Sequence, residues 1–385
     1  MFNSDEALAY SVKWQEPRES RLVEGPIPQT DDARTIAEGA IAAKSEEINS
    51  LGRFLWENPE IAFQEHQAHD RLCTFLENEG FNVKRHYVLD TAFRAECGAG
   101  SPVVALLCEY DALPGLGHGC GHNLIAESAL AAAVALRNLL RRHEELLGTT
   151  PEGKLSALFE WGEDPEDVGE EPRVMDAAVL GYANLSLLRE RLDPECRIHG
   201  IVITSEAKSA TEVLRSRLVF NVRAPSTEQL VRLRRDFEAC MKAAATASGC
   251  KVTVSEVVAL CKSMKFNEPL LKLFCRHANE YGFSFSDAED AIPRTTGGTS
   301  DAANVSHEVP TIHPLYRIDS ALVNHTAEFC RAAGTKDSQD KALDIGKALA
   351  LCTYDLFCDK SLVGCVWEAF RCPTKYPKKI PDSKE

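Results

Sequence analysis

The side chains that could do chemistry are concentrated in one stretch, residues 108–132, with the sequence CEYDALPGLGHGCGHNLIAESALAA. It follows the apolar run 103–107, which reads as a buried strand. The side chains of interest are Glu109, Asp111, His118, Cys120 and His122. Zinc accepts thiolate, imidazole and carboxylate ligands together, and open α/β sheets bind ligands beyond the carboxyl ends of their strands. The stretch therefore predicts a metal site, although a tight turn around a small buried cysteine would fit the same residues.

The surrounding sequence predicts the elements that must position this stretch. Apolar residues recur with helical spacing from Asp31 to Leu55, and the helix ends before Pro59, because proline disfavours helix in the preceding residue. Strands are expected at 81–87, 92–97, 103–108 and 153–159, with a helix at 123–143. Further along we expect helices at 173–191, 226–248, 267–281 and 337–357, strands at 197–205, 213–223, 251–260 and 309–318, and a turn at 297–306.

A second histidine pair, His66 and His69, lies three residues apart on another predicted helix. Side chains at that spacing are neighbours on a helix surface and could bind a metal ion. No third ligand is near in the sequence, so we expect a solvated helix face instead.

Composition and charge restrict the class of protein. The chain has 385 residues and a net charge of -15, which argues against nucleic acid or an anionic membrane as a partner. There is no apolar run long enough to span a bilayer, and the N-terminus lacks a signal-peptide core. The 14 cysteines have irregular spacing and form no CxxC pair, which argues against a zinc finger. In a chain that looks intracellular they favour reduced thiols, and we expect a cytoplasmic protein, with the nucleus as a second compartment.

CEYDALP followed by GHGCGHNLIAE resembles metallopeptidase family twenty, in the branch that uses Cys and His as metal ligands. The resemblance covers residues 35–160 and 172–355. It implies an α/β fold, with a mixed-sheet catalytic domain and an inserted, truncated α+β (ferredoxin-like) dimerisation domain. The implied division is a disordered extension (1–30), the catalytic domain in two parts (31–171 and 263–370), the dimerisation domain (172–262) and a disordered tail (371–385).

The same resemblance implies roles for particular residues. Cys120, His122 and His325 match ligands of zinc or manganese, and Asp111 matches the residue that orients the site. His118 and His313 are given supporting or structural roles. The expected substrate-binding residues are Arg223, Gly297, Gly298, Thr299 and Ser300.

The resemblance breaks after the strand at 153–159. A Glu-Glu pair and a later His-Pro should follow, but the chain reads GEDPEDVGEEPRVMDAAVL and has no histidine between His143 and His199. Several dozen residues are therefore missing. Either Glu166 and Asp167, or Glu170 and Glu171, replace the catalytic carboxylates, or this acidic run is a solvated linker. Charge runs are usually solvated, which favours the linker.

Two functions from different classes remain open, together with an incomplete product that has no stable function. The first is metal-dependent hydrolysis of the amide bond of dipeptides or N-acyl amino acids, with a basic C-terminal residue expected. The second is an impaired or inactive homologue that binds metal, small conjugates or a partner subunit. The first strand of the dimerisation domain falls in the missing segment, so a homodimer is expected to be weakened.

Overall fold

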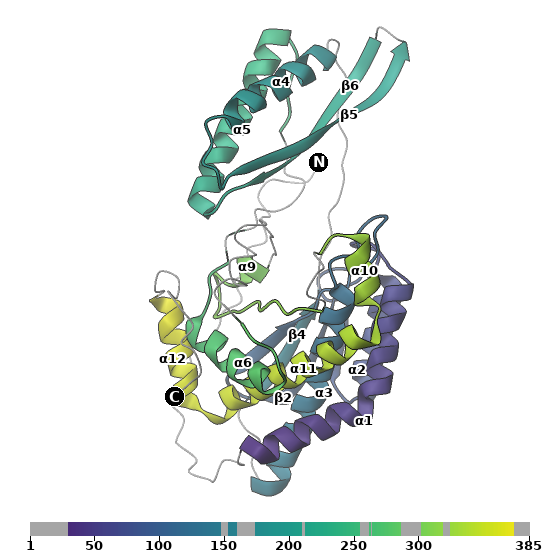
Figure 1. Cartoon of the computed structure of the whole chain (residues 1–385), viewed down its shortest axis with the longest axis vertical. Helices are drawn as coiled ribbons and strands as arrows, with labels where there is room; N and C mark the ends of the chain where they lie inside the picture. The colour runs from purple at the N-terminus through teal and green to yellow at the C-terminus, as the bar shows by residue number, and fades with distance from the viewer. Residues whose placement is uncertain are drawn as a thin grey trace.

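Figure 1 shows the computed structural model of the chain. It describes residues 30–147, 153–159, 174–209, 212–254, 262, 264–285, 302–318 and 324–372. The predicted N-terminal extension and C-terminal tail lie almost entirely outside these ranges. So do the acidic junction and the first five residues of the turn expected at 297–306.

A mixed four-stranded sheet forms the centre of the larger part of the molecule, as predicted. Its strand order is β1-β2-β4-β3. The strands are β1 (Asn82–Arg85), β2 (Phe93–Ala99), β3 (Val103–Leu107) and β4 (Gly153–Phe159). β4 runs antiparallel to β2 and parallel to β3, so β3 and β4 present their carboxyl ends at the same edge.

The burial predicted for β3 is only partly correct. The strand is present, but its residues are half-buried or exposed, and Val103 is 38% exposed. Within the described residues β3 is at the edge of the sheet, with β4 as its neighbour. An edge strand receives cover from one side only, which explains why an apolar run is left partly open.

Three helices cover the sheet and hold the main core. They are α1 (Thr30–Glu57), α3 (His122–Leu147) and α11 (Lys336–Cys358). Small residues let α3 and α11 approach closely, since a Cβ added at Gly346 would lie 2.5 Å from the Cβ of Ala131. Among the described helices, α3 is the one long and apolar enough to cross a membrane. In this molecule 83% of that stretch is buried, as is usual for a core helix.

Further helices extend this part of the molecule. α2 (His66–Asn78) precedes β1, and α6 (Glu268–Glu280) packs with α11 and α12 (Lys360–Arg371) in a second core cluster. The short helices are α9 (Ala302–Val305) and α10 (Ala327–Ala333). α9 stands where the end of a turn was expected, and α12 was not anticipated.

The strand predicted at 309–318 is wrong. Residues 310–317 carry no regular secondary structure. Pro310 and Pro314 lack the N–H group that a strand donates to its neighbour, and proline is therefore excluded from the interior of a sheet.

A second group of elements lies between β4 and α6 in the chain (Figure 1). It comprises α4 (Val174–Arg189), β5 (Arg197–Ser209), β6 (Glu212–Arg223) and α5 (Thr227–Ser248), with a core cluster of its own. Ile198 and Phe220 belong to the hairpin face that packs on the helices. The strand expected at 251–260 is not found at 251–254, and its remainder lies outside the described residues.

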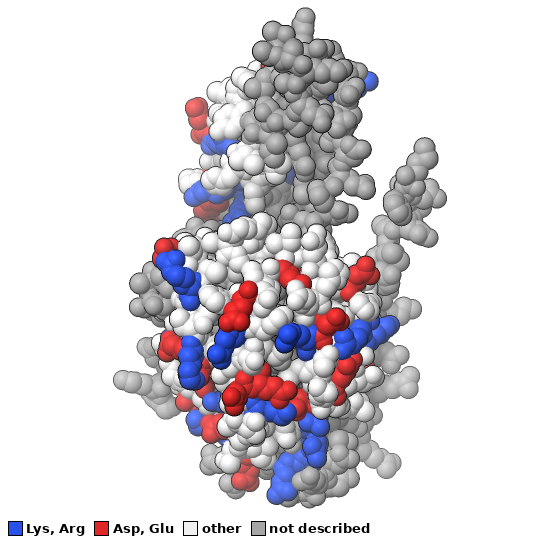
Figure 2. Space-filling view, turned by 90° about the vertical axis from the view of Figure 1, so that its right-hand side faces the viewer, with Lys and Arg blue, Asp and Glu red and all other residues white. Residues whose placement is uncertain are grey.

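Charged side chains of both signs are interspersed on the described surface seen in Figure 2. That face offers no continuous basic surface of the kind that binds phosphate backbones.

Candidate active site

The loop between β3 and α3 holds the predicted metal-binding residues in a fixed conformation. The backbone groups of Leu113 and Gly117 exchange hydrogen bonds of 2.9 and 3.0 Å, which closes a tight turn. Gly121 has a φ of 85°, a left-handed conformation that favours glycine. Its carbonyl accepts the N–H of Leu124 at the start of α3. The sequence therefore dictates a rigid connection that presents Cys120 and His122.

The ring of His122 is oriented by Asp111. Its Nδ1 lies 2.8 Å from Asp111 Oδ1 and 3.0 Å from the Asp111 carbonyl oxygen. Both partners can only accept, so we assign the proton to Nδ1 and leave Nε2 as the atom that could bind a metal. A carboxylate behind a histidine is the usual support of a metal-binding imidazole. Nε2 faces Glu109, whose Oε2 lies 3.0 Å away.

The electrostatics of His122 reflect this crowded setting. Burial lowers the pKa of His122, but hydrogen bonds with Asp111, Cys120 and Glu109 outweigh it and hold that pKa well above its ordinary range. Burial also lowers the pKa of His313, on which the charges of Glu109 and His122 act as well.

His118 has a different environment from its neighbours. It is 1% exposed, and neither ring nitrogen has a hydrogen-bond partner in good geometry among the described residues. Burial lowers the pKa of His118 to about 4, so the ring is neutral near pH 7. This environment is that of a core residue.

His325 reaches the loop from the far end of the chain. Its N–H donates to the Gly119 carbonyl at 2.8 Å, and its own φ is 64°, which is uncommon outside glycine. The next residue, Thr326, caps α10 by accepting the Phe329 N–H at 3.1 Å. Burial, then the charges of His122 and Arg223, lower the pKa of His325.

A network that the sequence did not reveal clamps the segment around Asp111 on both sides. Ala112 donates its N–H to the Glu60 carbonyl at 2.7 Å. The Tyr110 hydroxyl donates to the Thr91 carbonyl. Glu65, which is 2% exposed, accepts the Thr91 hydroxyl at 2.7 Å. The segment ENPEIAFQE before α2 carries Glu60 and Glu65, but its sequence does not show which residues they contact.

The expectation for the histidine pair on α2 is correct for His66 and wrong for His69. His66 is exposed. His69 is 1% exposed, and its ring stacks on that of His86 with centroids 4.6 Å apart. The chain after β1 folds back over His69, which local spacing alone does not encode.

Some of the predicted site residues lie close together in the structure, and others lie outside the described residues. Asp111, Cys120, His122 and His325 lie on or against one loop. Arg223 is on β6, where its Nε donates to Asn221 Oδ1 at 3.0 Å. Outside the described residues are Glu166, Asp167, Gly297, Gly298, Thr299 and Ser300. Within the described ranges, no three His, Cys, Asp or Glu side chains already form a group that could hold a metal ion.

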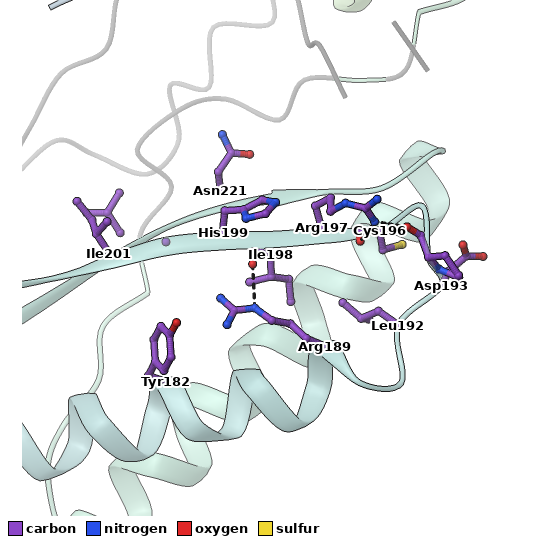
Figure 3. Close-up of a pocket in the computed structure, with 13 residues that line it drawn as sticks. Tyr182, Arg189, Leu192, Asp193, Cys196, Arg197, Ile198, His199, Ile201 and Asn221 are labelled. Atoms are coloured by element: carbon purple, nitrogen blue, oxygen red, sulfur yellow. Dashed lines mark hydrogen bonds between the residues drawn. The ribbon is translucent and has the colours of Figure 1, made fainter. Parts of the chain in front are cut away.

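A shallow groove lies elsewhere, between α4 and β5 (Figure 3). Tyr182 and Arg189 approach it from α4, and the Nε of Arg189 donates to the Ile198 carbonyl at 2.9 Å. None of the predicted site residues lines this groove.

Comparisons with known proteins point to one family, although no protein-family model matches the chain. Xaa-Arg dipeptidase of Mus musculus is 34% identical over 416 aligned positions, covering 93% of this chain and 95% of the relative. Its counterpart in Homo sapiens is 33% identical over 390 positions, covering 85% and 89%. Aminobenzoyl-glutamate utilization protein from Klebsiella pneumoniae has a similar structure, with a TM-score of 0.56, 12% identity, and coverage of 82% of this chain and 98% of that one.

The fold is α/β, and the curated relatives that the chain matches are peptidases and amidohydrolases. The long alignments with the two dipeptidases then show that the chain belongs to metallopeptidase family twenty, a family of hydrolases.

The alignment with the Mus musculus relative also contains more positions than this chain fills. It uses 93% of the 385 residues of this chain, about 358, to fill 416 positions, so about 58 positions are gaps on this side.

Proposed function

We propose that this chain hydrolyses the amide bond of dipeptides or N-acyl amino acids with a zinc or manganese ion held by Cys120, His122 and His325. The observation that supports this most is the orientation of His122, whose Nδ1 is fixed by Asp111 so that Nε2 is the ligand atom. Cys120 shares a hydrogen bond with the same ring. Thiolate and imidazole are donors that suit zinc.

The roles of the residues follow from this geometry. A bound ion would supply the Lewis acidity that polarises the amide carbonyl. Asp111 keeps His122 in the tautomer that can ligate, and the Gly119–His325 hydrogen bond holds the C-terminal ligand beside the loop. Because the Asp111 carboxylate is hydrogen-bonded to His122, another residue must act as the base that accepts the proton of the attacking water. Glu166 and Asp167 in the acidic junction are the candidates.

The substrate class is inferred from the names of relatives. They are Xaa-Arg dipeptidases and, over 27% of this chain at 38% identity, a component of the p-aminobenzoyl-glutamate hydrolase of Escherichia coli. Each name specifies an amino acid joined to a second group. We propose a basic C-terminal residue, with its carboxylate bound by Arg223 and by the backbone at Gly297, Gly298, Thr299 and Ser300. The cell compartment proposed is the cytoplasm, and the assembly a weak homodimer.

A second candidate function is an impaired homologue that binds metal or small conjugates without turnover. Two observations favour it. The chain has no histidine between His143 and His199, and the described residues contain no completed ligand set. Losing a general base typically costs 10²–10⁴-fold in rate.

Metal analysis and an assay on the same preparation separate these functions. The full chain would be freed of metal with EDTA, reloaded with zinc or manganese, and tested on β-alanyl-lysine, an Xaa-Arg dipeptide and p-aminobenzoyl-glutamate. We expect about one ion per chain, loss of that ion in Cys120→Ala, and hydrolysis that requires added metal. Bound metal without turnover of any substrate would favour the impaired homologue, and equal metal content in Cys120→Ala would remove Cys120 from the ligand set.

A further inference from the structure

Glu109 makes a contact that neither its place in the chain nor the proposed ligand set accounts for. Its Oε2 lies 3.0 Å from Nε2 of His122, the nitrogen left for metal binding. Both side chains are largely buried, at 20% and 16% exposure. The carboxylate is therefore held beside the ring nitrogen that the proposed ligand set assigns to the metal.

The spacing of these two atoms is close to that of two ligands on one ion. Zinc binds imidazole nitrogen and carboxylate oxygen at about 2.0–2.2 Å, and tetrahedral angles then place the two ligand atoms about 3.4 Å apart. A pair at 3.0 Å needs to open by a few tenths of an ångström to accept the ion.

We propose that Glu109 is an oxygen ligand of the metal ion bound by Cys120 and His122, in place of the carboxylate that the missing segment should have carried. The inference rests on the proposed metal-dependent function and names a further residue in its site. The charges support it, because the Cys120 thiolate and the Glu109 carboxylate together balance a divalent ion. Among the described residues these side chains do not yet form a closed ligand group, so the ring and the carboxylate must move apart as the ion enters.

Asp111 and Glu109 then have separate duties, although they are two residues apart. Asp111 contacts Nδ1 of His122 and Glu109 contacts Nε2, so the two carboxylates lie on opposite edges of one ring. Only the group at Nε2 can share an ion with that nitrogen.

Binding of Zn²⁺ and Co²⁺ to the full chain tests this assignment without relying on turnover. Competition with a chromophoric chelator would give affinities for the wild type, Glu109→Gln, Glu109→Asp and the matched control Glu46→Gln on the exposed side of α1. Removing outer-shell partners typically costs 10–100-fold in affinity, so we expect about 100-fold or more for Glu109→Gln. Glu109→Asp should recover part of that loss, and Glu46→Gln should bind as the wild type does.

The Co²⁺ spectrum keeps the result interpretable if a variant folds poorly. The thiolate-to-cobalt absorption of Cys120 should persist in Glu109→Gln at saturating metal and be absent in Cys120→Ala, with unchanged far-ultraviolet circular dichroism in both. Equal affinity in Glu109→Gln and the wild type would overturn this inference and leave the proposed function standing. A wild-type chain that binds neither ion would overturn both.

Discussion

At the scale of single residues, the tautomer of His122 is the feature on which metal binding depends. Asp111→Asn keeps the size of the side chain but can donate a hydrogen bond to Nδ1, which would move the ring proton to Nε2 and block the ligand atom. We expect affinity for zinc to fall about 10–100-fold, as for other supporting partners of metal ligands. Calorimetry on metal-free protein would measure this. Unchanged affinity would mean that Asp111 does not select the tautomer.

The residues of the site could be predicted from sequence to the extent that their signals are local. Cys120 and His122 lie within one short loop, so their closeness could be predicted from the sequence, and their role as metal ligands stays a prediction. His325 is about 200 residues away and was found only through resemblance to a family. The support from Glu65 and Thr91 could not be predicted, because it depends on side chains from three separate segments meeting beside Tyr110.

At the scale of elements, the periodicity of apolar residues predicted the helices α1, α3 and α11 well. The failed strand at 309–318 and the burial of His69 depend instead on local backbone chemistry and on contacts between distant segments. The apolar pattern at 309–318 suggested a strand, but two prolines remove the donors that a strand needs. His69 is buried because the chain beyond β1 passes over it, with His86 at a φ of 51°. The spacing of residues within α2 does not show that a later segment of the chain packs on His69.

The packing of α1, α3 and α11 encloses an acidic side chain with a predictable response to pH. Glu127 on α3 is fully buried, and neither carboxyl oxygen has a partner in good geometry among the described residues. Burial raises the pKa of Glu127 from 4.5 to about 9. The unfolded chain releases this proton near pH 4.5 and the folded chain keeps it, so the group destabilises the fold progressively as the pH rises from 4.5 to 9.

Glu127→Gln removes that dependence, because an amide does not titrate in this range. We expect the variant to gain stability over the wild type by about 1.4 kcal/mol for each pH unit within the window, reaching several kcal/mol by about pH 8.5. Urea unfolding at about pH 5.5 and 8.5 would measure the difference. Glu46→Gln on the exposed face of α1 is the matched control. Parallel pH curves for Glu127→Gln and the wild type would contradict the argument.

The hairpin β5–β6 bears on how tightly the proposed homodimer associates. Among the described residues it has no third strand, so less backbone and side-chain surface supports a dimer than a complete sheet would offer. We expect dimers at micromolar concentration to dissociate on dilution toward nanomolar. Sedimentation would measure this, with Ile201→Lys on the hairpin compared against Val179→Lys on α4, both at exposed positions. A dimer that survives nanomolar dilution in the wild type would show that the hairpin is sufficient.

At the scale of the whole molecule, the source of the catalytic base decides whether the site can turn over. If the acidic junction supplies the base, Glu166→Gln or Asp167→Asn should lower kcat for an Xaa-Arg dipeptide by about 10²–10⁴-fold with little change in metal content. Glu170→Gln and Glu171→Gln are matched variants within the same run. Equal rates in all four variants and the wild type would exclude the junction as the source of the base.

The arrangement of the main core has a consequence for synthesis on the ribosome. The cluster joins residues between Ala33 and Leu140 to residues of α11, from Leu343 onward, so it cannot close until nearly the whole chain has emerged. The group formed by α4, β5, β6 and α5 draws its core from residues 185–241 and is complete much earlier. This group can therefore fold first, while the face of α3 that packs on α11 is still exposed. During that interval the nascent chain is most prone to aggregation.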